Sequence, residues 1–587
     1  MKKCCFLLIL LAIIGGLLCA CGNTAQHPMI RVSLVETGDF YLEENGIQIY
    51  PGQNVTFTLQ MASGTELEAI DYDGQYYIWK ENGMTKVELR NVRFPTRVTP
   101  EVTRYFRSIT YDANGGTGEI GTVTYSTSIH TRPNTAIGTD TLSREGYTLT
   151  SWNTQPDGSG TRIGLGSRVT VPEAGLILYA QWSPWSSEGD FLWTVSDDGV
   201  KITGYIGAAD QAVIPERISG HPVTVIGAGA FADSAVTSVI LPPSLVAVEE
   251  GAFNSSALET LLLFDNIETV SDAAFAGCDQ LTTLYINAVE APYGYLFRRE
   301  SMYADKIDLM IDAQGQKKVV FYSGCSMWYN LNGEKAQTAL QDYTVINAAI
   351  NGTVNSYVQM QIMGHFLEEG DIFFHAPELS SPQQLMVVTD MGHNDDKLWC
   401  GLENNYDLFA LVDIRGIGGV FDTFCAYLSK KTEEATYRQQ YVDDKGNVYM
   451  DDTGSLPFLR TEPLEEIRET DLVVLDLQQI EDMRQSPLGD LYRSYADKGV
   501  AVYVSYGCVD RTALTEEEDA NISAADKLFR QVLEEMEAPI LVSTLWDYLY
   551  DESQFYDSAF HLLSPTVDNN TATWLRDLRK QMGKDGL

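Results

Sequence analysis

A segment in the middle of the chain repeats itself every 22 residues. Pairs of alanine and phenylalanine recur at this interval: Ala230-Phe231, Ala252-Phe253 and Ala274-Phe275. Two further apolar series keep the interval: Ile226, Val248 and Val270, and Leu241, Leu263 and Tyr285. A fixed period of this length predicts a solenoid, because each unit can bury its apolar edge only against a neighbouring unit. We therefore expect the Ala-Phe pairs to stack as an internal ladder within residues 190–290.

The residues around each pair have a recognisable pattern. Val225-Ile226-Gly227-Ala228-Gly229-Ala230-Phe231 is followed by Ile240-Leu241-Pro242. This pattern resembles the leucine-rich repeat of BspA-like bacterial surface proteins, with about three or four units at this period. The resemblance implies a surface protein. It leaves open whether the short array is a spacer or a docking face.

A second module precedes the solenoid, in residues 105–184. It carries Tyr111-Asp112-Ala113-Asn114-Gly115-Gly116, Gly146-Tyr147-Thr148-Leu149-Thr150-Ser151-Trp152, Asp157-Gly158 and Leu178-Tyr179-Ala180-Gln181-Trp182. Asn-Gly and Asp-Gly favour the positive φ angles of tight hairpins, and the aromatic residues hold short strands together. The segment resembles the internalin-type B repeat of bacterial surface proteins. That resemblance implies a small β module acting as a stalk or adhesive unit, and no enzyme.

The residues before this module, 22–104, alternate apolar and polar side chains. The apolar positions include Val55, Phe57, Leu59 and Met61, and turns are marked by Pro51-Gly52 and Asp73-Gly74. Alternation with a period of two predicts half-buried strands, hence a small β-domain. We expect it to be a spacer that carries the later modules away from the membrane.

The chain begins with the features of a lipoprotein secretion signal. Lys2 and Lys3 precede an apolar run over about residues 6–18, and the run leads into Leu18-Cys19-Ala20-Cys21. A small residue before the cysteine, here Ala20, selects Cys21 as the lipidated residue, so residues 1–21 are the expected signal peptide. The alternative is an uncleaved membrane helix, but the run is short for a span of about 20 residues and Gly15-Gly16 interrupts it. We expect an extracytoplasmic protein that touches the membrane through its lipid anchor.

Charge and cysteine content narrow the classes of partner. The formal net charge of −41 repels nucleic acid and other anionic polymers, so no nucleic-acid partner is expected. The cysteines after Cys21 are odd in number and scattered, which is no disulfide framework, although one bridge is possible: Cys278, Cys325, Cys400, Cys425 and Cys508. No spacing of cysteine or histidine suits a metal, and we expect neither metal nor cofactor.

The final segment, residues 296–587, differs from the rest. Short β-branched runs without polar alternation are separated by helical stretches such as 522–536: Val319–Tyr322, Tyr343–Ile346, Ile372–Phe374, Leu472–Leu475, Val500–Val504 and Pro539–Leu541. Continuous apolar strands alternating with helices predict a mainly parallel sheet covered on both faces, a three-layer α/β domain. The chain is thus expected to be multidomain, with N-terminal β modules, a short leucine-rich-repeat solenoid and this C-terminal domain.

Residues capable of acyl-transfer chemistry follow these strands. Ser326 lies two residues past Gly324 at a strand-to-helix turn, and Gly352 follows the second strand. Asp557 and His561 stand near the C-terminus. A serine hydroxyl needs an imidazole to take its proton and a carboxylate to orient that imidazole, and the free amides at a helix start can hold an oxyanion. The chain supplies these groups in the order Ser, Asp, His.

The C-terminal domain resembles the SGNH (GDSL-like) hydrolase superfamily in these short motifs. The resemblance implies Ser326 as nucleophile, Ser326 and Gly352 as oxyanion donors, and Asp557 and His561 as acid and base. Three features depart from the pattern. The Asp-to-His spacing is one residue longer than usual, Ala349 stands where a glycine is expected, and Pro377-Glu378 ends the third strand in place of an asparagine. Asn394, in Gly392-His393-Asn394-Asp395, is a candidate for that missing donor.

Two functions are compatible with these predicted domains and candidate residues. The first is a surface-anchored esterase or acyltransferase that acts on acyl esters, with cell-wall or extracellular carbohydrate as the expected carrier. The second is an adhesin or scaffold whose repeats bind a glycan or protein and whose terminal domain is inert, since a fold does not fix a function. The distance between Ser326 and His561 distinguishes them.

Overall fold

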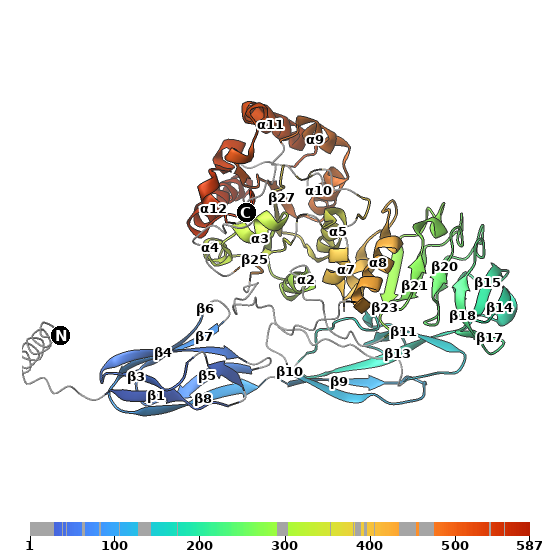
Figure 1. Cartoon of the computed structure of the whole chain (residues 1–587), viewed down its shortest axis with the longest axis horizontal. Helices are drawn as coiled ribbons and strands as arrows, with labels where there is room; N and C mark the ends of the chain where they lie inside the picture. Colours follow the sequence, from blue (N-terminus) through green and yellow to red (C-terminus); the bar gives the residue numbers. More distant parts are fainter. Residues whose placement is uncertain are drawn as a thin grey trace, which may run out of the picture. The chain divides into compact units, whose positions relative to one another are not determined.

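The computed structural model describes residues 29–586 with gaps (Figure 1). Outside the description lie residues 38, 43, 62–64, 82–83, 105, 127–141, 173, 290–302, 351, 353, 380, 382–384, 386–388, 393–395, 404, 434–452, 457–474, 539–541 and 557. The predictions for Cys21, Asn394 and Asp557, and most of those for strands at 472–475 and 539–541, therefore fall outside the described residues. The chain divides into two compact units, Met1–Phe106 with Ser126–Thr131, and Arg107–Tyr125 with Arg132–Leu587.

The first unit is a sandwich of two four-stranded sheets. One sheet has the order β3 (Ile47–Ile49), β1 (Ile30–Leu34), β8 (Thr96–Arg104), β5 (Thr65–Asp71). The other has the order β2 (Phe40–Leu42), β4 (Gln53–Met61), β7 (Met84–Val92), β6 (Tyr76–Glu81). The alternate side chains predicted to face inward do so: Val55, Phe57 and Leu59 are buried in the core between the sheets. Alternation with a period of two places these residues on one face of each strand.

The second unit begins with a five-stranded sheet. Its order is β10 (Gly121–Ser126), β9 (Phe106–Asp112), β13 (Leu176–Pro184), β11 (Tyr147–Asn153), β12 (Arg162–Ile163). The turn after β9 has positive φ angles at Asn114 and Gly115, as the Asn-Gly pair predicts. Trp152, a residue of β11, is completely buried.

The solenoid follows, with two stacks of strands. One stack contains β14 (Phe191–Ser196), β15 (Gly199–Tyr205), β18 (His221–Ile226), β20 (Ala247–Val248) and β22 (Thr269–Val270), with β17 (Arg217–Ile218) beside β18. The other contains β16 (Gln211–Val213), β19 (Ser238–Ile240), β21 (Thr260–Phe264) and β23 (Thr283–Asn287), all parallel. Figure 1 shows these short strands succeeding one another along the solenoid.

The ladder predicted from the 22-residue period is confirmed. The rings of Phe231 and Phe253 stack with centroids 4.8 Å apart, and those of Phe253 and Phe275 stack at 5.1 Å. All three side chains are buried. The stack continues beyond the period, to Tyr205 at one end (5.1 Å) and to Phe421 at the other (4.4 Å).

One of the two other periodic series does not keep a single row in the structure. Ile240 pairs with Leu262, 22 residues on, but Leu262 pairs with Tyr285, 23 residues on. Tyr285 therefore lies opposite Leu262, not in the row of Leu241 and Leu263. The last unit has one more residue between its loop and its strand, so the inward row continues with Ile286, which is buried.

The last part of the second unit is built on a parallel sheet of order β25 (Thr344–Asn347), β24 (Lys318–Tyr322), β26 (Ile372–His375), β27 (Ala501–Val504). The helices are α2 (Tyr303–Asp312), α3 (Cys325–Asn330), α4 (Gly333–Ala339), α5 (Ser356–Phe366), α7 (Asp396–Leu402), α8 (Val420–Glu433), α9 (Leu477–Asp482), α10 (Leu488–Ala496), α11 (Glu516–Glu535) and α12 (Ser564–Asp585). A short pair, β28 (Val509–Asp510) and β29 (Leu549–Tyr550), lies apart from the sheet.

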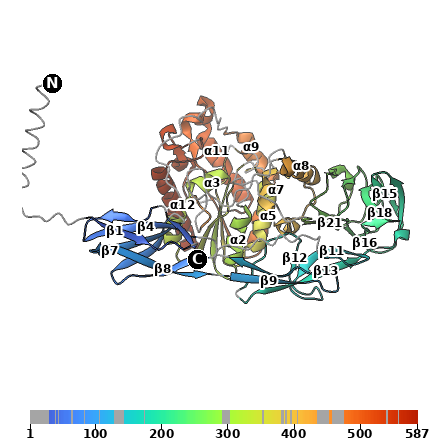
Figure 2. The ribbon, with the colours of Figure 1, turned by 60° about the horizontal axis from the view of Figure 1, so that its bottom comes forward.

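Helices cover both faces of this sheet (Figure 2). Phe373 of β26 packs against Tyr495 of α10, and Phe374 packs against Trp574 of α12. Successive side chains of a strand point to opposite faces, so α10 and α12 lie on opposite sides. Every residue of β24 is buried. The apolar run predicted at Val319–Tyr322 fills most of the strand, and the buried ammonium group of Lys318 pairs with Asp371 at 2.7 Å.

The five-stranded module is not a free stalk, because it shares an apolar core with the solenoid. Ile240, Leu262 and Phe264 of the solenoid belong to the same buried cluster as Trp152 and Leu178 of the module. The side chain of Asn287 adds two hydrogen bonds, to the carbonyl of Thr150 (2.9 Å) and from the amide of Leu165 (3.0 Å). These contacts cover one face of the sheet formed by β16, β19, β21 and β23, which therefore cannot serve as an open docking face.

The solenoid is also joined to the C-terminal α/β part. Phe421, at the start of α8, is the last ring of the ladder, and the carboxylate of Asp272 accepts hydrogen bonds from the amides of Gly419 and Phe421. Arg162 of the five-stranded module pairs with Asp407 at 2.7 Å. The three domains expected after residue 105 are thus held together in one unit.

Candidate functional site

The candidate site lies at the carboxyl edge of the parallel sheet, at the point where the order of the strands reverses. From β24 the chain passes to β25 on one side and then to β26 on the other. Open α/β sheets bind ligands at such a switch point, since the loops diverge there and leave a crevice. Ser326 follows β24, Gly352 follows β25 and Glu378 follows β26. The sheet topology therefore gathers these three residues from separate parts of the sequence.

Ser326 is the second residue of α3 and is buried. Its hydroxyl lies 3.4 Å from the hydroxyl of Ser323. Its backbone amide donates to Oε1 of Glu378 at 3.1 Å. The amide that the sequence assigns to an oxyanion therefore already has a negatively charged acceptor.

Glu378 is a residue of the candidate site that the sequence did not indicate. Its buried carboxylate lies between two glycines: a Cβ on Gly324 would lie 2.6 Å from Oε1, and a Cβ on Gly352 would lie 2.9 Å from Oε2. Both distances are too short for any side chain other than hydrogen, so the two glycines allow the carboxylate to approach the backbone. The only signal in the sequence was the position itself, Pro377-Glu378 at the end of the third strand, where an asparagine was expected.

His561 is held by α3, the helix that carries Ser326. Its ring stacks on Tyr329 with centroids 3.7 Å apart and planes 10° apart. The side chain of Asn330 donates to the carbonyl of Phe560 (2.6 Å) and accepts from the amide of Leu562 (2.8 Å), so it holds the backbone on both sides of His561. Tyr329 and Asn330 lie three and four residues after Ser326, which places all three on one face of the helix.

The candidate residues are therefore only partly assembled. The structure brings Ser326, Gly352 and the helix that supports His561 to one edge of the sheet, but the hydroxyl of Ser326 makes its side-chain hydrogen bond with Ser323. Asp557 and Asn394 lie outside the described residues.

A cysteine beside the site is no competing nucleophile. Cys508 is buried, accepts from Asn330 at 2.8 Å and donates to the carbonyl of Phe560 at 3.1 Å. Burial, reinforced by the charge of Glu378, raises the pKa of its thiol well above the usual value. A neutral thiol is a poor nucleophile, so Cys508 serves to position the segment that carries His561. The cysteines at 278, 325, 400, 425 and 508 are all free thiols.

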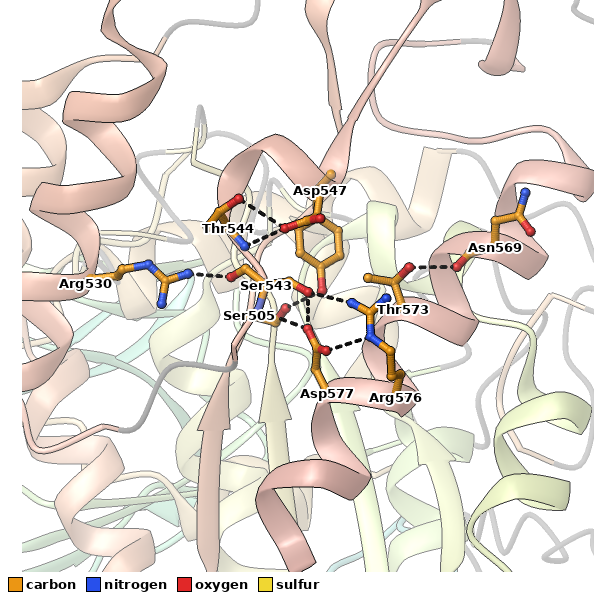
Figure 3. Close-up of polar contacts among 10 residues, drawn as sticks. Ser505, Arg530, Ser543, Thr544, Asp547, Asn569, Thr573, Arg576 and Asp577 are labelled. Atoms are coloured by element: carbon orange, nitrogen blue, oxygen red, sulfur yellow. Dashed lines mark hydrogen bonds and ion pairs between the residues drawn. The ribbon is translucent and has the colours of Figure 1, made fainter. Parts of the chain in front are cut away.

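A second polar cluster lies near α12 (Figure 3). Both the amide and the hydroxyl of Ser543 donate to the buried carboxylate of Asp577, which also accepts from Arg576 at 3.0 Å. Ser505 donates to the hydroxyl of Tyr548 at 3.0 Å. Arg576 already pairs with this carboxylate, and no imidazole belongs to the cluster among the described residues. The cluster therefore fixes α12 against the preceding segment and activates no nucleophile.

The described part of the chain contains neither a metal-binding cluster nor a membrane-spanning helix. No group of three or more His, Cys, Asp or Glu side chains there could hold a metal ion. No helix there is both long and apolar enough to cross a membrane.

Two family models match this chain. Residues 108–181 match the Listeria-Bacteroides repeat domain, and residues 214–327 match the BspA type leucine rich repeat region in six copies. The second match runs past β23 into residues that the structure folds as α2, β24 and the start of α3. The chain therefore contains BspA-type and Listeria-Bacteroides repeats, which are typical of surface adhesin-like proteins.

Individual relatives cover small parts of the chain. A putative membrane protein of Evansella cellulosilytica is 45% identical over 92 residues, which is 16% of this chain and 13% of that relative. A leucine-rich repeat protein of T. pallidum is 18% identical (17% of this chain, 70% of that one, TM-score 0.12). A leucine rich cell surface protein of Faecalibacterium prausnitzii is 20% identical (24% of this chain, 37% of that one, TM-score 0.15). The BspA-type repeats indicate the cell surface.

Proposed function

We propose that this chain is a bacterial surface lipoprotein whose C-terminal domain acts on acyl esters through Ser326, with the repeat modules as its rigid mount. The observation that carries the proposal is that α3 begins at the switch point of the sheet with Ser326 and, one turn later, holds His561 through Tyr329 and Asn330. A nucleophile and its base must be kept in a fixed relation, and a short helix that carries the one and contacts the other supports the proposal.

In the proposed reaction, Oγ of Ser326 attacks the ester carbonyl carbon while His561 takes its proton. Asp557 orients the imidazole, and the alcohol leaves with the proton from His561. The acyl group then passes from Ser326 to water or, in a transferase, to a sugar hydroxyl. The amides of Ser326 and Gly352 hold the oxyanion, with Asn394 as a third donor. An ester on cell-wall or extracellular carbohydrate suits a domain displayed at the surface.

Glu378 imposes a condition on this reaction. Its carboxylate accepts from the Ser326 amide, and a second negative charge cannot form at the same donor. Glu378 must therefore leave the amide before the tetrahedral intermediate forms. Glu378 is accordingly expected to slow the basal reaction.

Labelling by a fluorophosphonate probe tests the nucleophile. We expect the wild-type chain to take up the probe on Ser326, because a phosphonate traps a serine only when a base activates it. Ser326→Ala should abolish labelling. Ser543→Ala is the matched control, since Ser543 is a second buried serine that contacts a carboxylate. Labelling that survives Ser326→Ala, or that never occurs, would contradict the proposal.

Lipid attachment has its own test. Cys21→Ala is expected to move the protein from the membrane fraction to the medium or to leave an unprocessed precursor. Two acyl chains on one cysteine suffice for stable attachment at about 0.8 kcal/mol per buried methylene. Cys19→Ala is the control, because Leu18 before it is too bulky for processing. Normal processing and retention of Cys21→Ala would exclude the anchor.

The second candidate is an adhesin or scaffold with an inert terminal domain. One observation favours it: a carboxylate occupies the amide at which negative charge would have to develop. The partner would be an extracellular glycan or protein. It would bind away from the sheet formed by β16, β19, β21 and β23, because the five-stranded module covers one face of that sheet. The probe distinguishes the two functions, since an inert domain is not labelled at Ser326.

A further inference from the structure

One end of the N-terminal sandwich gathers exposed apolar side chains. Met29 is 48% exposed, Tyr50 is 50% exposed and Phe94 is 75% exposed. Strand register brings them to the same end: Ile30 pairs with Ile49, and Val32 pairs with Thr96. The amide of Gly52 also donates to the carbonyl of Val92 at 2.7 Å, which ties the two turns together. We name Met29, Tyr50, Phe94, Arg93 and Arg97 the sandwich tip.

The tip carries positive charge in a strongly acidic protein. Arg93 and Arg97 are exposed, and neither has a carboxylate within ion-pair distance in the described part of the sandwich. Of the carboxylates at this end, Asp71 is set back, since it pairs with Thr99 three residues inside β8. Asp73 follows it in the turn toward β6, and no ion pair joins Asp73 to Arg93 or Arg97 among the described residues of the sandwich. Arg90 is paired with Glu88. The whole chain has a formal net charge of −41, so two exposed arginines close together differ in sign from most of its surface.

The path of the chain puts this tip next to the proposed anchor. Met29 follows Cys21 by eight residues, a length that reaches at most about 26 to 29 Å. The chain leaves the sandwich at Arg104, at the other end of β8. Of the two ends of the sandwich, the tip is therefore the one the lipid keeps near the bilayer.

We propose that the sandwich tip docks on the surface of an anionic lipid bilayer. Phe94, Tyr50 and Met29 enter the interfacial region, where aromatic side chains are favoured, and Arg93 and Arg97 meet lipid phosphates. The acidic remainder of the chain is repelled by the same surface, so docking orients the sandwich with its tip toward the lipid. In the cell this docking rests on the proposed lipid anchor, which holds the tip near the bilayer. The affinity of the tip itself for lipid is independent of that anchor.

Vesicle sedimentation of the unlipidated chain, residues 22–587, tests the tip alone. We expect binding to phosphatidylglycerol vesicles and at least about tenfold weaker binding to phosphatidylcholine vesicles. The reason is that each arginine near an anionic surface raises the partition coefficient about fivefold. Arg93→Gln with Arg97→Gln should lower the partition coefficient about 25-fold. Phe94→Ala should lower it about fivefold, through lost apolar burial.

Two control variants lie at the opposite end of the same sandwich. Tyr41, 70% exposed, pairs with Gln60 near the end of β4, and Lys80 pairs with Thr85 at the start of β7. Tyr41→Ala and Lys80→Gln should bind vesicles as the wild-type chain does. Equal binding to both kinds of vesicle, unchanged binding of the tip variants, or equal losses in the controls would overturn the proposal. The tested chain carries no lipid, so a failure to bind vesicles would contradict docking by the tip alone. The separate proposal that Cys21 anchors the protein would be unaffected.

Discussion

Replacing Phe253 by alanine is expected to lower the free energy of unfolding of the solenoid by about 3 to 5 kcal/mol. Phe253 is completely buried between the rings of Phe231 and Phe275. The backbone on both sides is fixed, because β20 pairs with β18 and β22. Neighbouring rings therefore cannot close the cavity, which is the condition for a large loss. Chemical denaturation followed by circular dichroism measures it, and Ile206→Ala, an exposed side chain of the same solenoid, is the control.

The damage is expected to extend into the C-terminal part of the unit. The sequence alone predicts that this part stays folded when the repeat array is disrupted, since repeats contact only their neighbours. In the structure Phe421 is the next ring after Phe275, and Asp272 accepts from the amides at the start of α8. Hydrogen exchange should therefore rise in α8 as well as in β20 and β22. Unchanged protection of α8 in Phe253→Ala would show that the ladder ends at Phe275.

The solenoid illustrates what periodicity can and cannot predict. A period reports which side chains of each unit face the interior, and Phe231, Phe253 and Phe275 were predicted from it correctly. It does not report a single added residue in a loop, which moved Tyr285 out of its row. Nor does it report what packs on the outside. Residues such as Leu262 and Phe264 are apolar whether a strand faces solvent, a ligand or another module.

In the candidate site, too, some features could be predicted from the sequence and others could not. The position of Ser326 at a strand-to-helix turn could be predicted, because Gly324 and Ser326 closely follow an apolar strand. The position of the Glu378 carboxylate could not, since it depends on Gly324 and Gly352 approaching one another from two strands. The support of His561 by Asn330 spans more than two hundred residues and leaves no local pattern.

Removing the hydroxyl or the imidazole is expected to abolish ester turnover. In the full-length chain, Ser326→Ala and His561→Ala should each lower kcat for a small acyl ester by about 10³-fold or more, and the double variant should be no slower, because members of one relay are not additive. Asp557→Asn should lower kcat to a similar or smaller extent. Ser543→Ala, in the cluster around Asp577, should leave kcat unchanged. Additive losses in the double variant would mean that Ser326 and His561 act independently.

Glu378 should have the opposite effect in the same assay. Glu378→Ala removes the acceptor from the Ser326 amide, and restoring one oxyanion donor is worth up to about 10²-fold in kcat. Glu378→Gln is the matched variant: its amide oxygen still accepts from Ser326 but carries no charge, so its gain should be smaller. Both gains must vanish when Ser326→Ala is added, because only a reacting Ser326 uses that amide. If Glu378→Ala stays inactive while remaining folded and unlabelled by the fluorophosphonate, the carboxylate is a structural part of an inert domain, and the scaffold function stands.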